Sequence, residues 1–285
     1  MNTVLRVLEE RATDGVLPWA VQCAAVERYG WSCAAVEELA LVHGLLPARY
    51  QRNRGMISVA EQLQLFRSRI AVIGCGGLGG YVIEELARLG VGEIIAVDPD
   101  VFEEHNLNRQ LLATPRNLGK AKVEAALVRV NEINPAVTLT PIPTSFCPVN
   151  GRKLLTGATV AVDALDSISC RLELAKSCTE MNIPMVHGAI AGWFGQVVTQ
   201  LPGDTTVQDI YRNWVAGKGI EQQLGNPSFT PAVVASLQVA EVCKLILGRE
   251  GLLHRRKLSI DLLEMEIHSI PYVGLGELDA LPRPQ

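Results

Sequence analysis

The sequence has few aromatic residues, no excess of positive charge and no long uncharged stretch near its start. Aromatic residues make up 5% of the 285 residues, and the formal net charge at pH 7 is −4. A base-stacking platform and a basic field for nucleic acid or anionic lipid are therefore not expected. Two weakly charged stretches, residues 70–83 and 187–203, are too short to span a bilayer. We expect a soluble protein that binds neither nucleic acid nor membrane.

Closely spaced cysteine pairs are also missing. No two cysteines are separated by only two residues, which excludes zinc-knuckle spacing. An odd, scattered set argues against a disulfide framework and for a reducing compartment. Glu9, Glu10 and Asp14 interrupt any signal-peptide core, so we expect a cytoplasmic protein. The seven cysteines are Cys23, Cys33, Cys75, Cys147, Cys170, Cys178 and Cys243.

Residues 1–46 are predicted to form a helical extension. Apolar residues recur at helical spacing in three stretches, residues 4–8, 19–29 and 34–46. Gly30 suits the end of the second helix, and Ser32 suits the cap of the third. A DNA-binding helix-turn-helix has a similar pattern, but this segment contains three basic and six acidic residues. A docking or dimerisation role is favoured, and Pro47 marks the end of the extension.

From Arg69 onward the sequence alternates between strand-like and helix-like segments. Strands are predicted at residues 69–73, 93–97, 137–141, 159–162, 185–187 and 195–201, with a closing strand or hairpin at 258–270. Helices are predicted after the first strand through residue 89 and at residues 120–131, 169–181 and 232–247. This alternation predicts an open α/β sheet with parallel strands.

A glycine-rich turn follows the first of these strands. Gly74, Gly76, Gly77 and Gly79 allow a tight turn that brings the backbone close to phosphates, and the next helix offers free N–H groups. Asp98 ends the following strand, nineteen residues after Gly79, where its carboxylate can accept ribose hydroxyls. Nucleotide binding is predicted, although the pattern fits a nicotinamide or flavin dehydrogenase equally well. The alternative is that the glycines serve only helix–sheet packing.

Two basic residues distinguish these interpretations. Arg109 lies eleven residues after Asp98, and Lys122 follows thirteen residues later. Either alone would more often be a solvated surface charge. Together they are suited to clamp a triphosphate, one by bidentate geometry and one as a point charge. A dehydrogenase that binds a diphosphate at a helix terminus does not need them.

Several further motifs occur in a fixed order. The set comprises Arg49-Tyr-Gln-Arg-Asn53, Gly74 to Gly79, Asp98, His105-Asn-Leu-Asn-Arg-Gln110, Lys122, Asp163-Ala-Leu-Asp166 with Arg171, the Gly188-to-Gly195 segment before Gln196, and Ser236-Leu-Gln-Val-Ala-Glu241. From about Arg49 to Ile270 the chain resembles the HesA/MoeB/ThiF branch of the ubiquitin-activating-enzyme family. The resemblance implies a Rossmann-like, doubly wound, mostly parallel sheet and an ATP-binding adenylation domain over residues 47–285.

The same resemblance implies an activity and a partner. Family members are adenylyltransferases that use ATP and magnesium to activate the C-terminal glycine carboxylate of a small ubiquitin-like protein. In the sulfur-carrier pathways, a carrier of the ThiS or MoaD kind then accepts sulfur for thiamine, molybdopterin or tungstopterin synthesis. We therefore expect ATP, magnesium and such a carrier as the ligands of this chain.

Roles for individual residues also come from the resemblance. It assigns catalysis to Arg52, Arg109, Lys122 and Asp166, and nucleotide binding to Gly74, Gly76, Gly77, Gly79, Asp98, Asn106 and Ser167, together with Arg109 and Lys122. Asp166 would hold the magnesium ion; its alternative role is the N-cap of the helix predicted at 169–181. Arg52 matches an arginine that reaches the phosphates from the other protomer, which implies a homodimer.

The sequence departs from the family pattern at its cysteines. Many relatives bind a structural zinc through two C-x-x-C pairs, whereas this chain has none, and no zinc is expected. Relatives that form a covalent intermediate carry a cysteine in the loop matching residues 215–231, which here contains none. Cys243 has the spacing of a core residue. Adenylation without a covalent cysteine intermediate is therefore predicted.

Aromatic residues concentrate around that loop. They are Trp193, Phe194, Tyr211, Trp214 and Phe229. They are suited either to cradle the extended tail of a carrier or to core packing. Other functions also stay open: adenylation of a peptide or a modified tRNA base, an NAD-binding oxidoreductase, and a degenerate scaffold that binds ATP without turnover.

Overall fold

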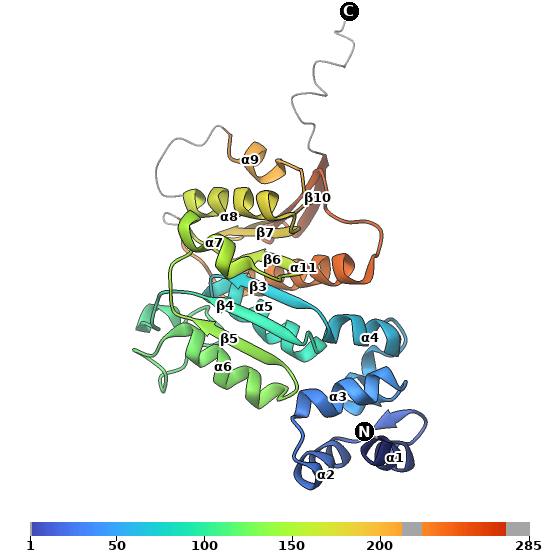
Figure 1. Ribbon diagram of the computed structural model, residues 1–285. Coiled ribbons are helices and arrows are strands. Elements are labelled where there is room, and N and C mark those ends of the chain that lie inside the picture. Colours follow the sequence, from blue (N-terminus) through green and yellow to red (C-terminus); the bar gives the residue numbers. More distant parts are fainter. Residues whose placement is uncertain (1, 213–223, 272–285) are drawn as a thin grey trace, which may run out of the picture.

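The computed structural model describes residues 2–212 and 224–271, and its main feature is an eight-stranded sheet (Figure 1). The strands are β3 (Arg69–Ile73), β4 (Glu93–Val97), β5 (Thr138–Ile142), β6 (Val160–Asp163), β7 (Met185–Ala191), β8 (Phe194–Gln200), β9 (Arg256–Asp261) and β10 (Glu266–Pro271). Their order across the sheet is β10-β9-β8-β7-β6-β3-β4-β5. The five strands from β5 to β7 are parallel, and β8 to β10 add an antiparallel edge. The predicted α/β fold with a mostly parallel sheet is confirmed.

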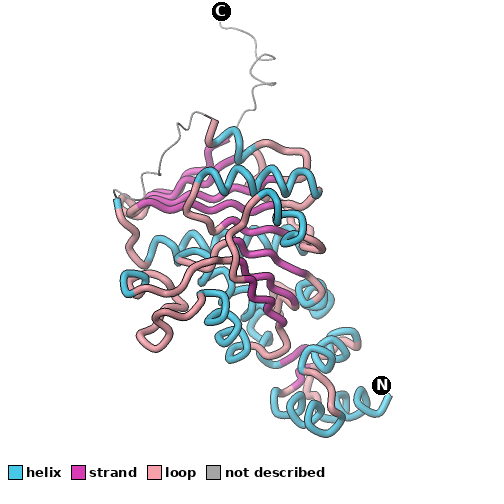
Figure 2. Tube along the Cα trace, turned by 60° about the vertical axis from the view of Figure 1, so that its left-hand side comes forward, coloured by secondary structure: helices cyan, strands magenta, loops and turns pink. Residues whose placement is uncertain are grey.

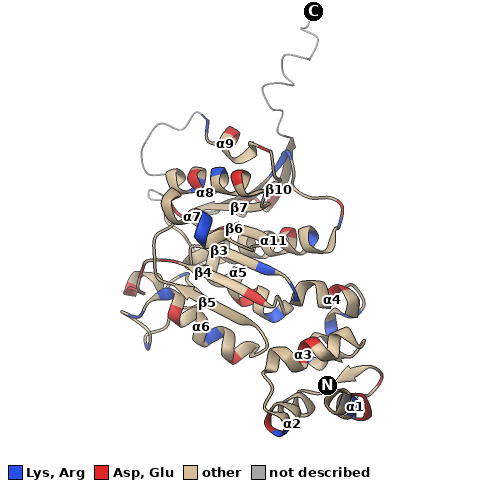
Figure 3. Cartoon of the chain, viewed as in Figure 1, with Lys and Arg blue, Asp and Glu red and all other residues tan. Residues whose placement is uncertain are grey.

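Helices cover both faces of the sheet because successive strand residues point to opposite sides. One face packs against α5 (Gly77–Leu89), α6 (Lys122–Ile133) and α11 (Phe229–Leu247), and the other against α7 (Pro148–Leu155), α8 (Ile168–Met181) and α9 (Thr206–Ile210). In β3, Val72 belongs to the first core and Ile73 to the second. Most of the strand residues are uncharged in Figure 3, and the charged residues lie mainly on helices and connecting segments. The sheet is therefore doubly wound, as expected.

Helix α11, predicted from the sequence at residues 232–247, is long and apolar enough to cross a membrane by length and composition alone. In the structure, 44% of its most apolar window is buried against the rest of the chain. Val234, Ala235 and Val242 are buried in the core of the first face. Gln238 is also buried, and its Nε2 donates to the backbone carbonyl of Asp163 at 2.9 Å. The packing of α11 on the sheet accounts for its apolar composition.

The N-terminal helices form a separate cluster, which lies at one corner of the molecule in both Figure 1 and Figure 2. They are α1 (Asn2–Arg11), α2 (Trp19–Tyr29) and α3 (Cys33–Val42), and a short parallel pair joins β1 (Val16–Leu17) to β2 (Leu46–Pro47). Gly30 ends α2 in the left-handed conformation, with φ of 66°, and Ser32 Oγ accepts from Ala35 N at 3.1 Å. Both predicted caps are confirmed. The proposed boundary after residue 46 falls inside β2.

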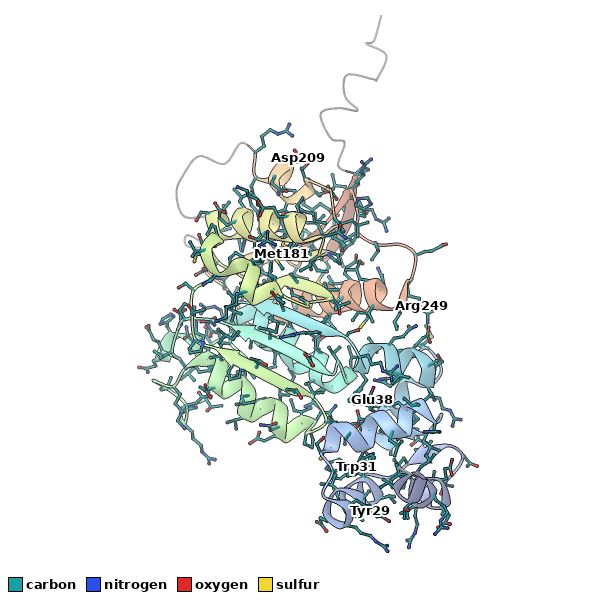
Figure 4. All side chains as sticks on the ribbon, in the orientation of Figure 1. Tyr29, Trp31, Glu38, Met181, Asp209 and Arg249 are labelled. Carbon is teal, nitrogen blue, oxygen red and sulfur yellow. The ribbon has the colours of Figure 1, made fainter. Side chains whose placement is uncertain are left out.

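A buried polar cluster joins this extension to the sheet domain. The connecting elements are η1 (Ala48–Asn53) and α4 (Val59–Phe66). The Tyr50 hydroxyl donates to Glu37 Oε1 at 2.6 Å and accepts from Asn134 Nδ2 at 2.8 Å. On the surface, Arg67 pairs with Glu38 at 2.9 Å, and Glu38 is labelled beside α4 in Figure 4. These contacts connect α3 and α6 through η1.

Candidate nucleotide-binding site

A cavity of about 320 Å³ opens at the carboxyl ends of β3, β4 and β6. Strand β4, which follows β3 in the sequence, pairs with one edge of β3, and β6 pairs with its other edge. The strand order therefore reverses at β3. Ligands of open α/β sheets bind at such a reversal of strand order. Of the residues predicted from the sequence, the cavity is lined by Gly74, Gly76, Gly77, Asp98, Arg109, Lys122 and Asp166.

The glycine turn has this shape because two of its positions cannot hold a side chain. Gly74 has φ of 97°, and a Cβ there would lie 2.5 Å from the Ala164 carbonyl oxygen. A Cβ on Gly79 would lie 1.8 Å from the Gly74 carbonyl oxygen. Gly79 therefore closes the turn without lining the cavity, whereas Gly76 and Gly77 begin α5 at the cavity wall.

Asp98 stabilises this turn through two hydrogen bonds from the backbone. Its Oδ2 accepts from Cys75 N at 2.7 Å and its Oδ1 accepts from Asp100 N at 2.8 Å. Burial raises the pKa of the Asp98 carboxyl, and the nearby Lys122 ammonium opposes that shift. Because an ionised carboxylate has about four lone-pair positions, two remain for ribose hydroxyls. The expected ribose contact is compatible with the hydrogen bonds that Asp98 makes to the turn.

Two of the predicted cations, from the connection between β4 and α6 and from the first residue of α6, line the same cavity. Lys122 begins α6; its Nζ lies 2.9 Å from Asp100 Oδ2, and its backbone N donates to the Asp100 carbonyl at 3.0 Å. Arg109 Nη1 donates to the His105 carbonyl at 3.1 Å and to Asn108 Oδ1 at 2.8 Å, and burial lowers the pKa of the Arg109 guanidinium. Such cations suit an anionic ligand such as a triphosphate.

Asp166 is exposed at the cavity wall, and Ser167, the next residue, is the N-cap position of α8. The alternative N-cap role of Asp166 is therefore wrong. Within residues 2–212 and 224–271, no three His, Cys, Asp or Glu side chains cluster to hold a metal. Magnesium, however, is commonly bound by one or two carboxylates together with substrate phosphates and water. Asp166 fits that arrangement for a phosphate-bound ion.

Three other predicted residues lie outside the cavity lining. Asn106 is buried, and its Oδ1 accepts from Glu103 N at 3.0 Å, which caps η2 (Glu104–Asn106). Ser167 Oγ lies 2.8 Å from Ser169 Oγ. Arg52 is exposed on η1, whose Tyr50 packs against Gly90 at the opposite end of α5 from the cavity. Arg52 therefore does not contribute to the cavity of its own chain.

Gln110 and Arg171 are cavity residues to which the sequence assigned no role. Gln110 lines the cavity with 7% of its surface exposed, and its buried Oε1 has no hydrogen-bond partner in the described part of the chain. Its position directly after Arg109 was the available signal. Arg171 lines the same cavity from α8.

A second cavity of about 260 Å³ adjoins the first, and Arg171 and Ile190 line both. Apolar groups from α8, β7 and β8 form most of its wall, together with Gln196, Tyr211 and Ser259. Of the five aromatic residues singled out from the sequence, Phe194 and Tyr211 line this cavity. Trp193 and Phe229 pack together with ring centroids 4.5 Å apart, and Trp214 lies outside the described residues.

Two of the seven cysteines are fully buried, and a third, Cys243, packs against the core. Cys75 and Cys178 are buried, and burial raises the pKa of Cys178 to about 12 and that of Cys243 to about 11. Thiols with such pKa values are poor nucleophiles at neutral pH. Cys170 lines the first cavity, which the sequence did not indicate.

Comparisons with known proteins agree with this geometry. Residues 50–274 match the ThiF family. The chain is 33% identical over 228 residues to the SAMP-activating enzyme E1 of Haloferax volcanii, covering 79% of this chain and 84% of that protein. It is 30% identical to a probable molybdopterin-synthase adenylyltransferase of Porphyra purpurea, covering 69% and 53%, and 32% identical to the adenylyltransferase and sulfurtransferase MOCS3 of Aedes aegypti, covering 75% and 50%. The chain thus spans about half the length of these last two relatives.

Solved structures show the same fold. The crystal structure of E. coli MccB with succinimide superposes with a TM-score of 0.67 at 24% identity, covering 80% of this chain and 72% of that one. The structure of E. coli MccB with ATP gives a TM-score of 0.63 at 23% identity, with the same coverage. The family match spans most of the chain and contains both cavities. The chain therefore belongs to the ThiF family, and it is an adenylyltransferase.

Proposed function

We propose that this enzyme uses ATP and magnesium to adenylate the C-terminal glycine carboxylate of a small ubiquitin-like sulfur-carrier protein. The observation that carries the proposal is the junction of the two cavities at Arg171 and Ile190. The first cavity provides cations for phosphates, and the second provides a mostly apolar recess for an acyl substrate. Relatives are named for SAMP activation and for molybdopterin-synthase adenylylation, which supports a carrier protein as the substrate.

The reaction needs charge neutralisation more than proton transfer. A carboxylate oxygen attacks the α-phosphorus, an O–P bond forms, and the bond from that phosphorus to the β-phosphate oxygen breaks to release pyrophosphate. The attacking carboxylate is already ionised, so no general base is required. Arg109 and Lys122 would offset the charge of the approaching anions, as electrostatic catalysis of phosphoryl transfer requires. Magnesium, held by Asp166, would supply further positive charge at the phosphates.

We also propose an oligomeric state, a cellular location and a pathway for this enzyme. Because Arg52 lies away from the cavity of its own chain, we propose a homodimer in which each chain supplies Arg52 to the other. We also propose adenylation without a covalent cysteine intermediate, a cytoplasmic enzyme that uses no zinc, nucleic acid or membrane, and a division between residues 1–46 and 47–285. The carrier would serve thiamine synthesis or molybdopterin or tungstopterin synthesis.

Carrier-dependent exchange of labelled pyrophosphate into ATP tests the function. We expect exchange with a carrier that ends in Gly-Gly and none with the same carrier shortened by two residues, because the reacting carboxylate is then misplaced. Mass spectrometry of the acyl-adenylate identifies the product. Exchange supported by a short peptide or by tRNA, but by no carrier, would contradict the proposed substrate. NADH binding without ATP binding would contradict the reaction.

A further inference from the structure

A network of polar side chains, three of them buried and one partly buried, lies beneath the junction of the two cavities. Asp163 ends β6, His187 lies in β7, and both side chains are fully buried. Hydrogen bonds connect His187 to Tyr211, which follows α9, and Tyr211 to Arg171 of α8. Figure 4 shows α9, where Asp209 is labelled, lying over α8. Four elements that are separate in the sequence therefore meet at this point.

The hydrogen bonds define the protonation state of His187. Its Nδ1 lies 2.6 Å from Asp163 Oδ2, so Nδ1–H donates to the carboxylate. Its Nε2 lies 3.1 Å from the Tyr211 hydroxyl and 3.3 Å from Gln196 Nε2, an amide nitrogen that can only donate. His187 Nε2 therefore accepts, and the imidazole is neutral. Burial lowers the pKa of His187, which favours the same form.

The Tyr211 hydroxyl transmits this arrangement to Arg171. The hydroxyl donates a hydrogen bond to His187 Nε2, and its oxygen accepts from Arg171 Nη1 at 3.0 Å and from Gln196 Nε2 at 3.0 Å. The other side of the guanidinium donates to the Leu165 carbonyl, from Nε at 3.1 Å and from Nη2 at 2.5 Å. All three nitrogens of Arg171 are thus directed by fixed acceptors, and its side chain is only 6% exposed.

We propose that His187 and Tyr211 are positioning residues that hold the Arg171 guanidinium at the junction of the two cavities, where it binds the substrate carboxylate as it meets the α-phosphate. This inference rests on the proposed function. Asp163 Oδ2 lies 3.9 Å from Arg171 Nε and partly offsets its charge. An approaching carboxylate would add an opposite charge to a buried cation that is already oriented, which reduces the entropy lost on binding.

Another buried hydrogen bond on β8 provides a matched control. Thr199 Oγ1 donates to Glu241 Oε2 at 2.6 Å, with both side chains buried, yet neither residue lines either cavity. Thr199→Val removes this bond from the strand that also carries Gln196. A loss of stability alone would therefore appear in Thr199→Val as well, whereas a loss of positioning would not.

The kinetic test uses variants of the full chain with ATP, magnesium and the carrier. Tyr211→Phe removes the hydroxyl, and we expect kcat/KM for the carrier to fall about tenfold or more while ATP affinity changes less than about twofold. His187→Gln retains an acceptor and should keep more activity than His187→Ala. Because His187 acts through Tyr211, His187→Ala combined with Tyr211→Phe should be little worse than Tyr211→Phe alone. Thr199→Val should lower the melting temperature without changing kcat/KM.

A second measurement does not depend on the carrier. In protein labelled with ¹⁵N-arginine, the Nη1–H signals of Arg171, assigned with Arg171→Lys, should be protected from exchange in the wild type and in Thr199→Val but not in Tyr211→Phe. Unchanged Arg171 signals in Tyr211→Phe would overturn the inference, as would additive kinetic effects. Wild-type protein without carrier-dependent exchange would overturn the proposed function instead, and the Arg171 signals would still decide whether the positioning is real.

Discussion

The two cavities are built in different ways. The first is formed mainly by the glycine turn and by the segment from Asp98 to Lys122, and Lys122 is paired there with Asp100, whose side chain is 63% exposed. The second meets it at Arg171, whose guanidinium is directed by partly buried partners that follow β6 and α9. A cation with an exposed partner can re-pair with incoming phosphates, whereas one fixed by several partly buried groups has a single geometry. In the proposed reaction, the charge that faces the phosphates can therefore adapt, and the geometry at the acyl group is fixed.

Gly79→Ala is expected to have the largest effect, because it breaks the first cavity at its turn. The new Cβ would lie 1.8 Å from the Gly74 carbonyl oxygen, and this backbone atom cannot move without opening the turn. We expect ATP affinity to fall by at least about 100-fold and the free energy of unfolding to fall by about 3 kcal/mol. Calorimetric titration with ATP and denaturant unfolding measure the two effects.

Gly80→Ala is the matched control, since it adds the same methyl group one residue later in α5. Its Cβ would meet Leu112 at 3.4 Å, an ordinary contact, and Gly80 does not line the cavity. We expect ATP affinity close to that of the wild type. Equal losses in the two variants would show that the contact with Gly74 is not what makes glycine necessary.

Lys122→Met tests the charge of the first cavity without changing its backbone. The ammonium is nearly buried, and a methionine of similar length keeps the packing. Removing one cation from the site of phosphoryl transfer is expected to lower kcat/KM for ATP by about 10²–10³-fold. Lys120→Met, on an exposed lysine two residues earlier, should have little effect. Similar losses in both variants would indicate a long-range charge effect in place of contact with the phosphates.

The sequence predicted the first cavity better than the second for a physical reason. The glycine turn, Asp98, Arg109 and Lys122 follow strand ends or lie in one connection, so spacing along the chain brings them together. Asp163 and His187 meet only because they are register partners on β6 and β7. No local pattern specifies that pairing.

The same limit explains most of what was missed in the fold. The predicted helices at 19–29 and 169–181 agree closely with α2 and α8, because their periodicity and caps are local. Helices α4, α7 and α9 were not predicted. They are five to eight residues long, too short to show a clear helical period. Tyr211, which follows α9, was therefore singled out only as an aromatic residue near a loop.

In the proposed dimer, the first cavity would be incomplete in a single chain, because its Arg52 comes from the other chain. We expect Arg52→Ala and Lys122→Met each to be nearly inactive alone. If the two variants exchange subunits, each mixed dimer contains one cavity with both Lys122 and the Arg52 of the other chain. A mixture at equal concentrations should therefore recover about one quarter of wild-type activity. Pyrophosphate exchange after mild dissociation and reassembly measures the recovery. No recovery in confirmed mixed dimers would contradict a role for Arg52 across the interface.

The smallest expected effect concerns the pH dependence of stability near the second cavity. Burial lowers the pKa of His187 in the folded protein below its ordinary value of about 6.5, so the unfolded chain binds more protons near that pH. The stabilisation from the neutral imidazole is then fully present above about pH 6.5 and decreases as the pH falls below it. The free energy of unfolding of the wild type should therefore decrease relative to that of His187→Gln between about pH 7 and pH 5, by ~1.4 kcal/mol for each unit of pKa shift. Urea unfolding of both proteins across this range gives the difference. A constant difference between the two proteins would mean that His187 does not titrate in this range. A wild type that becomes more stable relative to His187→Gln toward low pH would mean that the imidazole is charged in the folded protein, contrary to the hydrogen bonds that hold Arg171.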